Sequence, residues 1–264
     1  MSPPPLPSPL ASIGAVVRLQ LRQSARGKRL RLGVGATLLV LLTVVAGRYL
    51  GEGSDPSVVM KQGLTWGFFR LLDFLLPFLL TSGVIAEEVE SRTFTYLAAR
   101  PIGRGSLVLG KYLASTGMSV ALIAAAILLM HFACFATQPG AMIEELPSTL
   151  RAIGATTELI LLYGAICLFW GALVPEAAGI ASTLYLGIIE FCFSFAPGVL
   201  RWISMSHHAQ ELSGLERGGI EFIAETVPDV SAMVSALTIG LLCLFFLALA
   251  VITVQLSEFR FGKA

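Results

Sequence analysis

The sequence predicts an all-α polytopic membrane protein, and its composition and hydropathy pattern carry that prediction. Of the 264 residues, 55% are hydrophobic and only 13% are charged, whereas soluble domains contain about 25% charged residues. The mean hydropathy is +0.80, and the apolar residues form runs of about 20, the length of a helix that crosses ~30 Å of hydrocarbon. Since a soluble domain of this length cannot bury so much apolar surface, we expect a bundle of membrane-spanning helices.

Six apolar runs are long enough to span a bilayer, because a helix satisfies its own backbone hydrogen bonds in lipid. Pro77 lies within the second run and predicts a kink there. The sequence Val174-Pro175-Glu176 predicts a tight turn, and hence adjacent antiparallel fourth and fifth helices. We expect a disordered, Pro-rich N-terminus at residues 1–9 and one transmembrane domain at 10–264. Its predicted spans are about 32–50, 64–86, 112–137, 152–174, 177–197 and 231–256.

Lys and Arg are distributed unevenly among the segments that connect these runs. Twelve of the 18 lie in segments 18–31, 92–111 and 260–263, and five lie in the alternate connections. Because cytoplasmic loops carry the excess of Lys and Arg, we expect both termini to be cytoplasmic. The expected location is the bacterial cytoplasmic (inner) membrane. Apolar and basic residues repeat at helical spacing within 13–29. This pattern predicts an amphipathic helix in the inner interface, with its bases facing anionic lipid.

The connector between the second and third runs is unusually polar and is expected to face the cytoplasm. Its residues Glu88 and Arg92 stand four apart, as helical salt-bridge partners do. Phe94 and Leu97 stand three apart and form an apolar patch on the same short helix, which ends before Pro101 because the residue before proline avoids the α region. Lys111, at the start of the third span, is expected to extend its ammonium group to the inner surface.

The order of residues in this connector resembles the type-2 ATP-binding-cassette (ABC) exporter permeases. The match lies in Glu87–Ala99, in Arg100-Pro101-Ile102-Gly103-Arg104 and in Leu107–Ala114; Gly103 departs from it, since a Ser is common there. The resemblance implies a permease that forms a homodimer and docks on separate ATPase subunits. ATP and Mg would bind to those subunits, and no cofactor is expected in this chain. The implied ATPase-coupling residues are Glu87, Glu88, Arg92, Phe94, Tyr96, Leu97 and Arg100.

The predicted function is therefore the permease subunit of an ABC transporter that exports an unidentified substrate, and the chain itself is not expected to be an enzyme. An alternative of another class is a mechanotransmitter or anchor, in which the same ATPase drives an extracytoplasmic partner and moves no substrate. The segment Gly105–Lys111 fits GxxxxGK, but a P-loop also needs a following Ser or Thr and a preceding strand. Nucleotide binding by this chain is therefore not expected.

A CAAX-type intramembrane protease is a further alternative, because Glu87, Glu88 and Arg92 fit its EExxxR motif. Such an enzyme also needs histidines on its spans, close to these glutamates. Only His131 lies in a predicted span, whereas His207 and His208 are predicted on the opposite side of the membrane. This geometry makes the protease the weaker prediction.

Five ionisable residues fall within the predicted spans and are expected in their outer half. A lone charge in hydrocarbon is costly, so these groups should face the bundle or water and pair with one another. Arg70 is the permanent cation, and its possible partners are the carboxylates. Such a cluster either gates or lines a translocation route or serves only as a structural ion pair, and the sequence leaves both readings open. Its members are Arg70, Asp73, His131, Glu158 and Glu190.

The segment 198–230 is predicted on the outer side, where it folds back on the membrane or binds a periplasmic partner. His207, His208 and Glu211 form a weak metal-binding pattern, but a solvated loop is the preferred interpretation and no metal is expected. The net charge of +1 gives no indication of nucleic-acid binding. The four cysteines are far apart inside apolar runs and are expected to be packing residues.

Overall fold

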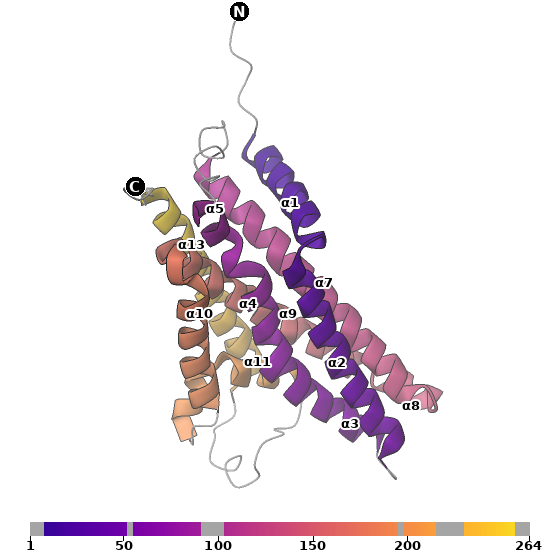
Figure 1. The fold of residues 1–264 in the computed structure, drawn as a ribbon. Helices are drawn as coiled ribbons and strands as arrows, with labels where there is room; N and C mark the ends of the chain where they lie inside the picture. Colours follow the sequence, from indigo (N-terminus) through magenta and orange to yellow (C-terminus); the bar gives the residue numbers. More distant parts are fainter. Residues whose placement is uncertain (1–7, 52–54, 91–102, 195–197, 215–229, 257–264) are drawn as a thin grey trace, which may run out of the picture.

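The computed structural model of the chain describes residues 8–51, 55–90, 103–194, 198–214 and 230–256, and every regular element in these ranges is a helix (Figure 1). Within them, five helices are long and apolar enough to cross a membrane. The predicted class, an all-α polytopic membrane protein, is confirmed. The five are α2 (Lys28–Leu50), the composite helix Pro56–Glu87, α7 (Arg104–Phe135), α9 (Leu146–Leu173) and α13 (Ala232–Leu256).

The second span consists of four consecutive helical elements. They are α3 (Pro56–Gln62), the π-helix η1 (Gly63–Leu72), α4 (Asp73–Thr81) and α5 (Gly83–Glu90). Asp55 caps α3 by accepting a hydrogen bond from the Ser57 N–H at 2.9 Å, and this bond lowers the pKa of Asp55. Pro77 lies inside α4 and has no N–H for the carbonyl four residues before it. The span is thus irregular on both sides of Pro77, with η1 before it and a break at Ser82 after it.

The predicted fifth span falls on a series of shorter elements. The 3₁₀ turn η2 (Pro175–Ala177), α10 (Ala178–Leu186) and the π-helix η3 (Gly187–Cys192) follow one another without a gap. α10 packs against α9, which confirms the tight reversal predicted at Val174-Pro175-Glu176. Because this series changes helix type twice, no single helix in it is long enough to count as a candidate span. The number of six spans stays a prediction.

Helix α9 forms the centre of the bundle. It contacts α4, α7, α10, α13 and α11 (Met205–Ser213). Leu159, Ile160 and Leu162 on α9 are fully buried. By contrast, α2 and α13 lie at the periphery and expose most of their apolar side chains, as expected of helices that face lipid. A short 3₁₀ element, η4 (Gly198–Ile203), precedes α11.

Helices α1 (Pro9–Ala25) and α2 follow α7 in the same direction along its whole length (Figure 1). At the far end, Arg48 and Tyr49 of α2 donate hydrogen bonds to the carbonyl oxygens of Cys134 and Ala133 at 3.2 and 2.9 Å. α7 is about 48 Å long at 1.5 Å per residue, whereas the hydrocarbon layer is only ~30 Å thick. The first turns of α7, and α1 beside them, therefore extend beyond the hydrocarbon. The interfacial orientation of α1 stays a prediction.

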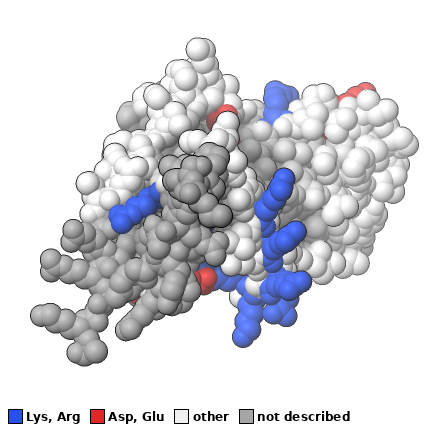
Figure 2. Space-filling model, turned by 90° about the horizontal axis from the view of Figure 1, so that it is seen from above, with Lys and Arg blue, Asp and Glu red and all other residues white. Residues whose placement is uncertain are grey.

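One end of the bundle gathers several segments that are far apart in the sequence. The start of α1, the end of α5, the start of α7 and the end of α13 all lie there (Figure 1). Lys and Arg side chains collect along one side of this end (Figure 2), and all six bases between Arg18 and Arg31 are exposed. The opposite end carries α3, α8 (Pro139–Glu144) and the start of α9 (Figure 1). The end that holds the start of α1 thus carries the group of bases on which the orientation prediction rests, and the orientation itself stays a prediction.

A glycine sets the closest approach between α1 and α7. A Cβ atom on Gly110 would lie 2.7 Å from the Cβ of Val16 and 3.1 Å from the carbonyl oxygen of Ile13. We predict that Gly110→Ala lowers the free energy of unfolding by up to about 2 kcal/mol, because the overpacking cost of about 1–3 kcal/mol outweighs the gain of about 1 kcal/mol in helix propensity. Thermal unfolding of the detergent-purified protein measures this change.

Gly117, on the same helix, is the matched control, because a Cβ there would meet nothing within 4 Å. Gly117→Ala should leave the midpoint of unfolding unchanged or raise it. Equal midpoints for the two variants would contradict the packing of α1 on α7.

Candidate functional sites

The structure describes the flanks of the predicted coupling segment. Arg92, Phe94, Tyr96, Leu97 and Arg100 lie outside the described residues. Glu87 and Glu88 lie on α5, the last helix before that segment, and α7 begins directly after it. The contacts of α5 and of the start of α7 therefore show how this segment is joined to the bundle.

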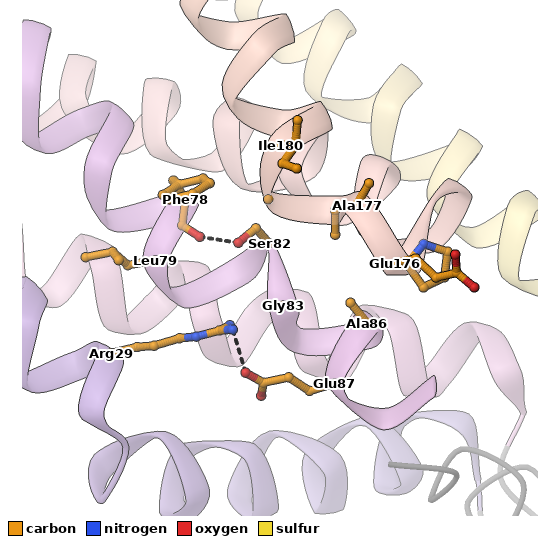
Figure 3. A pocket seen from close by; sticks show the side chains of 13 residues that line it. Arg29, Phe78, Leu79, Ser82, Gly83, Ala86, Glu87, Glu176, Ala177 and Ile180 are labelled. Atoms are coloured by element: carbon orange, nitrogen blue, oxygen red, sulfur yellow. Dashed lines mark hydrogen bonds and ion pairs between the residues drawn. The ribbon is translucent and has the colours of Figure 1, made fainter. Parts of the chain in front are cut away.

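Glu87 on α5 is bound to the start of α2. Its carboxylate lies 2.6 Å from the guanidinium of Arg29, and the two side chains are 61% and 44% exposed (Figure 3). The guanidinium passes over Gly83, where any side chain would collide with it. Since exposed ion pairs contribute only about 0–1 kcal/mol, this pair adds little to the stability of the fold. Its effect is to hold the end of α5 next to the start of α2.

Lys111 on α7 holds α5 from the other side. Its side chain is only 4% exposed, and its Nζ donates a hydrogen bond to the carbonyl oxygen of Val84 at 3.0 Å. The prediction that Lys111 extends to the inner surface is wrong. A carbonyl of the neighbouring helix lies within reach, and it satisfies the ammonium group inside the bundle. α5 is consequently attached to both the first and the third span.

A cavity of about 280 Å³ separates α5 from the start of the fifth span (Figure 3). Arg29, Gly83 and Glu87 line one wall, and Glu176 and Ile180, from η2 and α10, line the other. The turn between the fourth and fifth spans therefore lies at the same level as the ion pair. Movement of α5 would change this cavity.

A second site lies between the second and fifth spans, where a cavity of about 280 Å³ brings Arg70 and Glu190 to a common space. Arg70 lies on η1 and Glu190 on η3, so each residue stands on a π-helical segment. π-helical turns are rare and often mark functional sites. The other lining residues are mostly aromatic or small: Trp66, Phe69, Phe74, Tyr163, Leu186, Gly187, Ser194 and Ser206.

Arg70 and Glu190 do not form the predicted ion pair. In the described part of the chain, no ion pair joins Arg70 to Asp73, Glu158 or Glu190. The Arg70 guanidinium lies 4.5 Å from the centre of the Trp66 ring, a cation–π contact. The π-helical winding of both segments decides this arrangement, and the sequence carries no clear signal for it.

Glu190 caps helix α11 instead. Its carboxylate accepts hydrogen bonds from the hydroxyl of Ser204 at 2.9 Å and from the backbone N–H groups of Met205 and Ser206 at 2.9 and 3.1 Å. An acidic group at a helix N-terminus satisfies N–H groups that have no partner within the helix and faces the positive end of its dipole. Glu190 therefore holds the η4–α11 segment against the fifth span.

Asp73 is the most deeply buried of the acidic residues. It is 0% exposed, and within the described residues neither of its carboxylate oxygens accepts a hydrogen bond. It interacts electrostatically with Tyr163, which also interacts with Glu190. Tyr163 also lines the cavity, and sequence reasoning missed it because a tyrosine in an apolar run has no distinguishing neighbours.

His131 and Glu158 lie apart from this cavity. His131 is 0% exposed, and its Nε2 lies 3.0 Å from the carbonyl oxygen of Met142, which can only accept, so Nε2 carries a proton. Its Nδ1 lies 2.8 Å from the hydroxyl of Thr149. His131 therefore joins the end of α7 to α8 and to the start of α9. Glu158 is half-buried on α9 and lines neither of the cavities described above.

The histidines of the predicted outer loop are buried. His207 and His208 are 2% and 4% exposed, so the interpretation of this part of the loop as solvated is wrong. Nε2 of His208 lies 2.9 Å from the carbonyl oxygen of Trp202, and its Nδ1 lies 3.2 Å from the hydroxyl of Ser235. Because α11 is capped by Glu190 and packs on α9 and α13, this segment folds back into the bundle. The remainder of the loop, residues 215–229, lies outside the described residues.

The cap on α11 generates a stability prediction. Glu190→Gln replaces one accepting oxygen with an amide that can only donate. It should lower the free energy of unfolding by about 1–3 kcal/mol, because a backbone N–H is left without its acceptor. Glu158→Gln is the control, since Oε2 of Glu158 accepts no hydrogen bond within the described residues; its unfolding midpoint should stay unchanged or rise. Thermal unfolding compares the two, and equal losses would argue against the cap.

Comparison with known proteins places these features in a family. A search of curated proteins found no match. The family model described as ABC-2 family transporter protein matches residues 26–184. The match covers more than half of the chain and includes Arg29, α5, the start of α7 and most of α10. The chain therefore belongs to the ABC-2 family of transporter proteins, and it is a membrane-spanning permease subunit of an ABC transporter.

Proposed function

We propose that this permease couples ATP hydrolysis by a separate ABC ATPase to the export of a substrate, with the segment around 87–100 as the point of contact. The family membership implies an ATPase partner. The basic end of the bundle, where α5 ends and α7 begins, is the cytoplasmic end in this proposal. The membrane is a bacterial inner membrane, and two copies of the chain form the permease.

The attachment of α5 is the observation that carries the proposal. α5 is bound to α2 through Arg29 and Glu87 and to α7 through Lys111 and Val84. It also faces the start of the fifth span across the cavity of Figure 3. A partner that pushes on the segment after α5 would therefore act on several spans together.

The second span connects this point to the intramembrane cavity. α5 continues through α4 into η1, which carries Arg70. π-helical turns within helices are rare and are frequently found at functional sites. We infer that the cavity between η1 and η3 lines or gates the route of the substrate. We also infer that Asp73, which is buried near this cavity but does not line it, serves transport, since a buried ionisable residue within a span usually serves a function.

The contact with the ATPase has a direct test. Phe94→Asp and Leu97→Asp, made together, should reduce copurification of the ATPase with the tagged permease by at least about tenfold, because charges in an apolar contact cost several kcal/mol. Pull-down from detergent extracts with quantification of the ATPase measures the loss.

The control is Ile143→Asp, an equally apolar position that is 74% exposed on α8, at the opposite end of the bundle. It should leave the ATPase attached. If the Phe94 and Leu97 variant retains its ATPase, the coupling assignment is wrong.

The role of the intramembrane cavity has a separate test. Arg70→Leu should leave the permease bound to its ATPase, since Arg70 lies on η1, two helical elements before the end of α5, where the proposed contact with the ATPase begins. When it is expressed in a strain that lacks the chromosomal gene for this permease, the variant should nevertheless fail to restore the wild-type phenotype, because the cavity loses its permanent cation. Arg151→Leu, a change of the same kind at an exposed position of α9, should rescue fully. Full rescue by Arg70→Leu with normal assembly would leave the cavity with a structural role only.

A further inference from the structure

A third cavity lies where α1 ends and α2 begins, and neither the coupling proposal nor the route of the substrate uses it. Its volume is about 560 Å³. It is enclosed by four parts of the fold: the end of α1 with the junction to α2, the first turn of α2, α4 with α5, and α7. Its polar lining consists of Gln20, Gln23, Ser24, Lys28, Arg29, Lys111 and Glu87.

The charges of this lining favour an anion. Among the described lining residues, three cations, Lys28, Arg29 and Lys111, face one carboxylate, Glu87, which Arg29 binds at 2.6 Å. Lys111 is 4% exposed, and from that depth its interaction with a negative group is screened much less than at the surface. The cavity therefore carries an excess of positive charge in a partly enclosed space.

The start of α2 adds backbone donors to these side chains. Gly27, Lys28 and Leu30, at the beginning of a 23-residue helix, all line the cavity. No side chain caps this helix. The first N–H groups of a helix bear the positive end of its dipole, and together with basic side chains they bind phosphate groups.

The surroundings of the cavity indicate that this phosphate belongs to a lipid. The apolar run of α2 begins at Leu32, directly after the basic first turn. Leu32, Leu39 and Leu42 are 62%, 64% and 66% exposed, so they form an apolar surface that leads away from the cavity. Exposed bases on α1 and at the start of α2 would attract anionic lipids to this side of the bundle (Figure 2).

We propose that this cavity binds the phosphate headgroup of an anionic phospholipid whose acyl chains lie along α2. Lys28, Lys111 and the first turn of α2 hold the phosphate, and Gln20 and Gln23 contact the rest of the headgroup. The lipid occupies the junction between α1 and α2 and lies beside the Arg29–Glu87 pair. The proposal concerns lipid binding by the permease alone and does not depend on the ATPase.

Native mass spectrometry of the delipidated, full-length protein tests this site with two lipids, phosphatidylglycerol and phosphatidylcholine. The wild type should bind phosphatidylglycerol more tightly. Lys28→Gln and Lys111→Met should each weaken that binding by about tenfold, the effect of losing one charge-assisted hydrogen bond. Lys28 is exposed, so its variant keeps the test valid even if Lys111→Met fails to fold.

Arg18→Gln is the matched control, because Arg18 is an exposed base of α1 that does not line the cavity. It should bind phosphatidylglycerol as the wild type does. Equal losses in Arg18→Gln and Lys28→Gln would show general surface attraction and overturn the site, and so would equal affinity for the two lipids. Competition by inorganic phosphate at the concentration of the lipid would overturn the assignment to a lipid, since the acyl chains would then contribute nothing.

Discussion

A hydrocarbon layer penalises every charge and every unpaired backbone group placed in it, and this penalty organises the whole chain. Helices satisfy the backbone, so the described elements are helical throughout. Charges are either moved to the ends of the bundle or given partners inside it. The bases between Arg18 and Arg31 lie exposed at one end of the bundle. Inside the bundle, Lys111 donates a hydrogen bond to a backbone carbonyl, and Glu190 accepts hydrogen bonds at the N-terminus of a helix.

The same penalty explains how α5 is joined to its neighbours. At the basic end of the bundle the charged groups are still within reach of the helices, so they bind one another and join adjacent spans. The Arg29–Glu87 pair contributes little stability because it is exposed. Its effect is geometric, since it joins α5 to the first span. Lys111 joins α5 to the third span, and α5 also contacts η2 and α10 at the start of the fifth. The adjoining basic cavity, where we propose that a lipid headgroup binds, shares Arg29, Glu87 and Lys111 with these contacts.

The acidic residues within the spans differ in how their burial is offset. Glu190 has three donors, whereas Asp73 has none among the described residues and is fully buried. Native structures rarely leave a buried polar group unsatisfied. The unsatisfied carboxylate of Asp73 lies near a cavity that residues of two π-helical segments line. A site that must change its contacts during transport would tolerate such a cost, whereas His131, with both ring nitrogens bonded, belongs to the rigid part.

The fold class, the helical reversal at Pro175 and the group of bases at one end could all be predicted from residue order, because they depend on local hydropathy and local charge. Which charged groups meet could not be predicted, because it depends on how the helices pack. Arg70 and Glu190 reach one cavity without pairing, Lys111 turns inward, and His207 and His208 are buried. These outcomes depend on the rotation of each helix about its axis and on two π-helical segments. Residue spacing does not encode either, because a small change in winding turns a side chain from one neighbour to another.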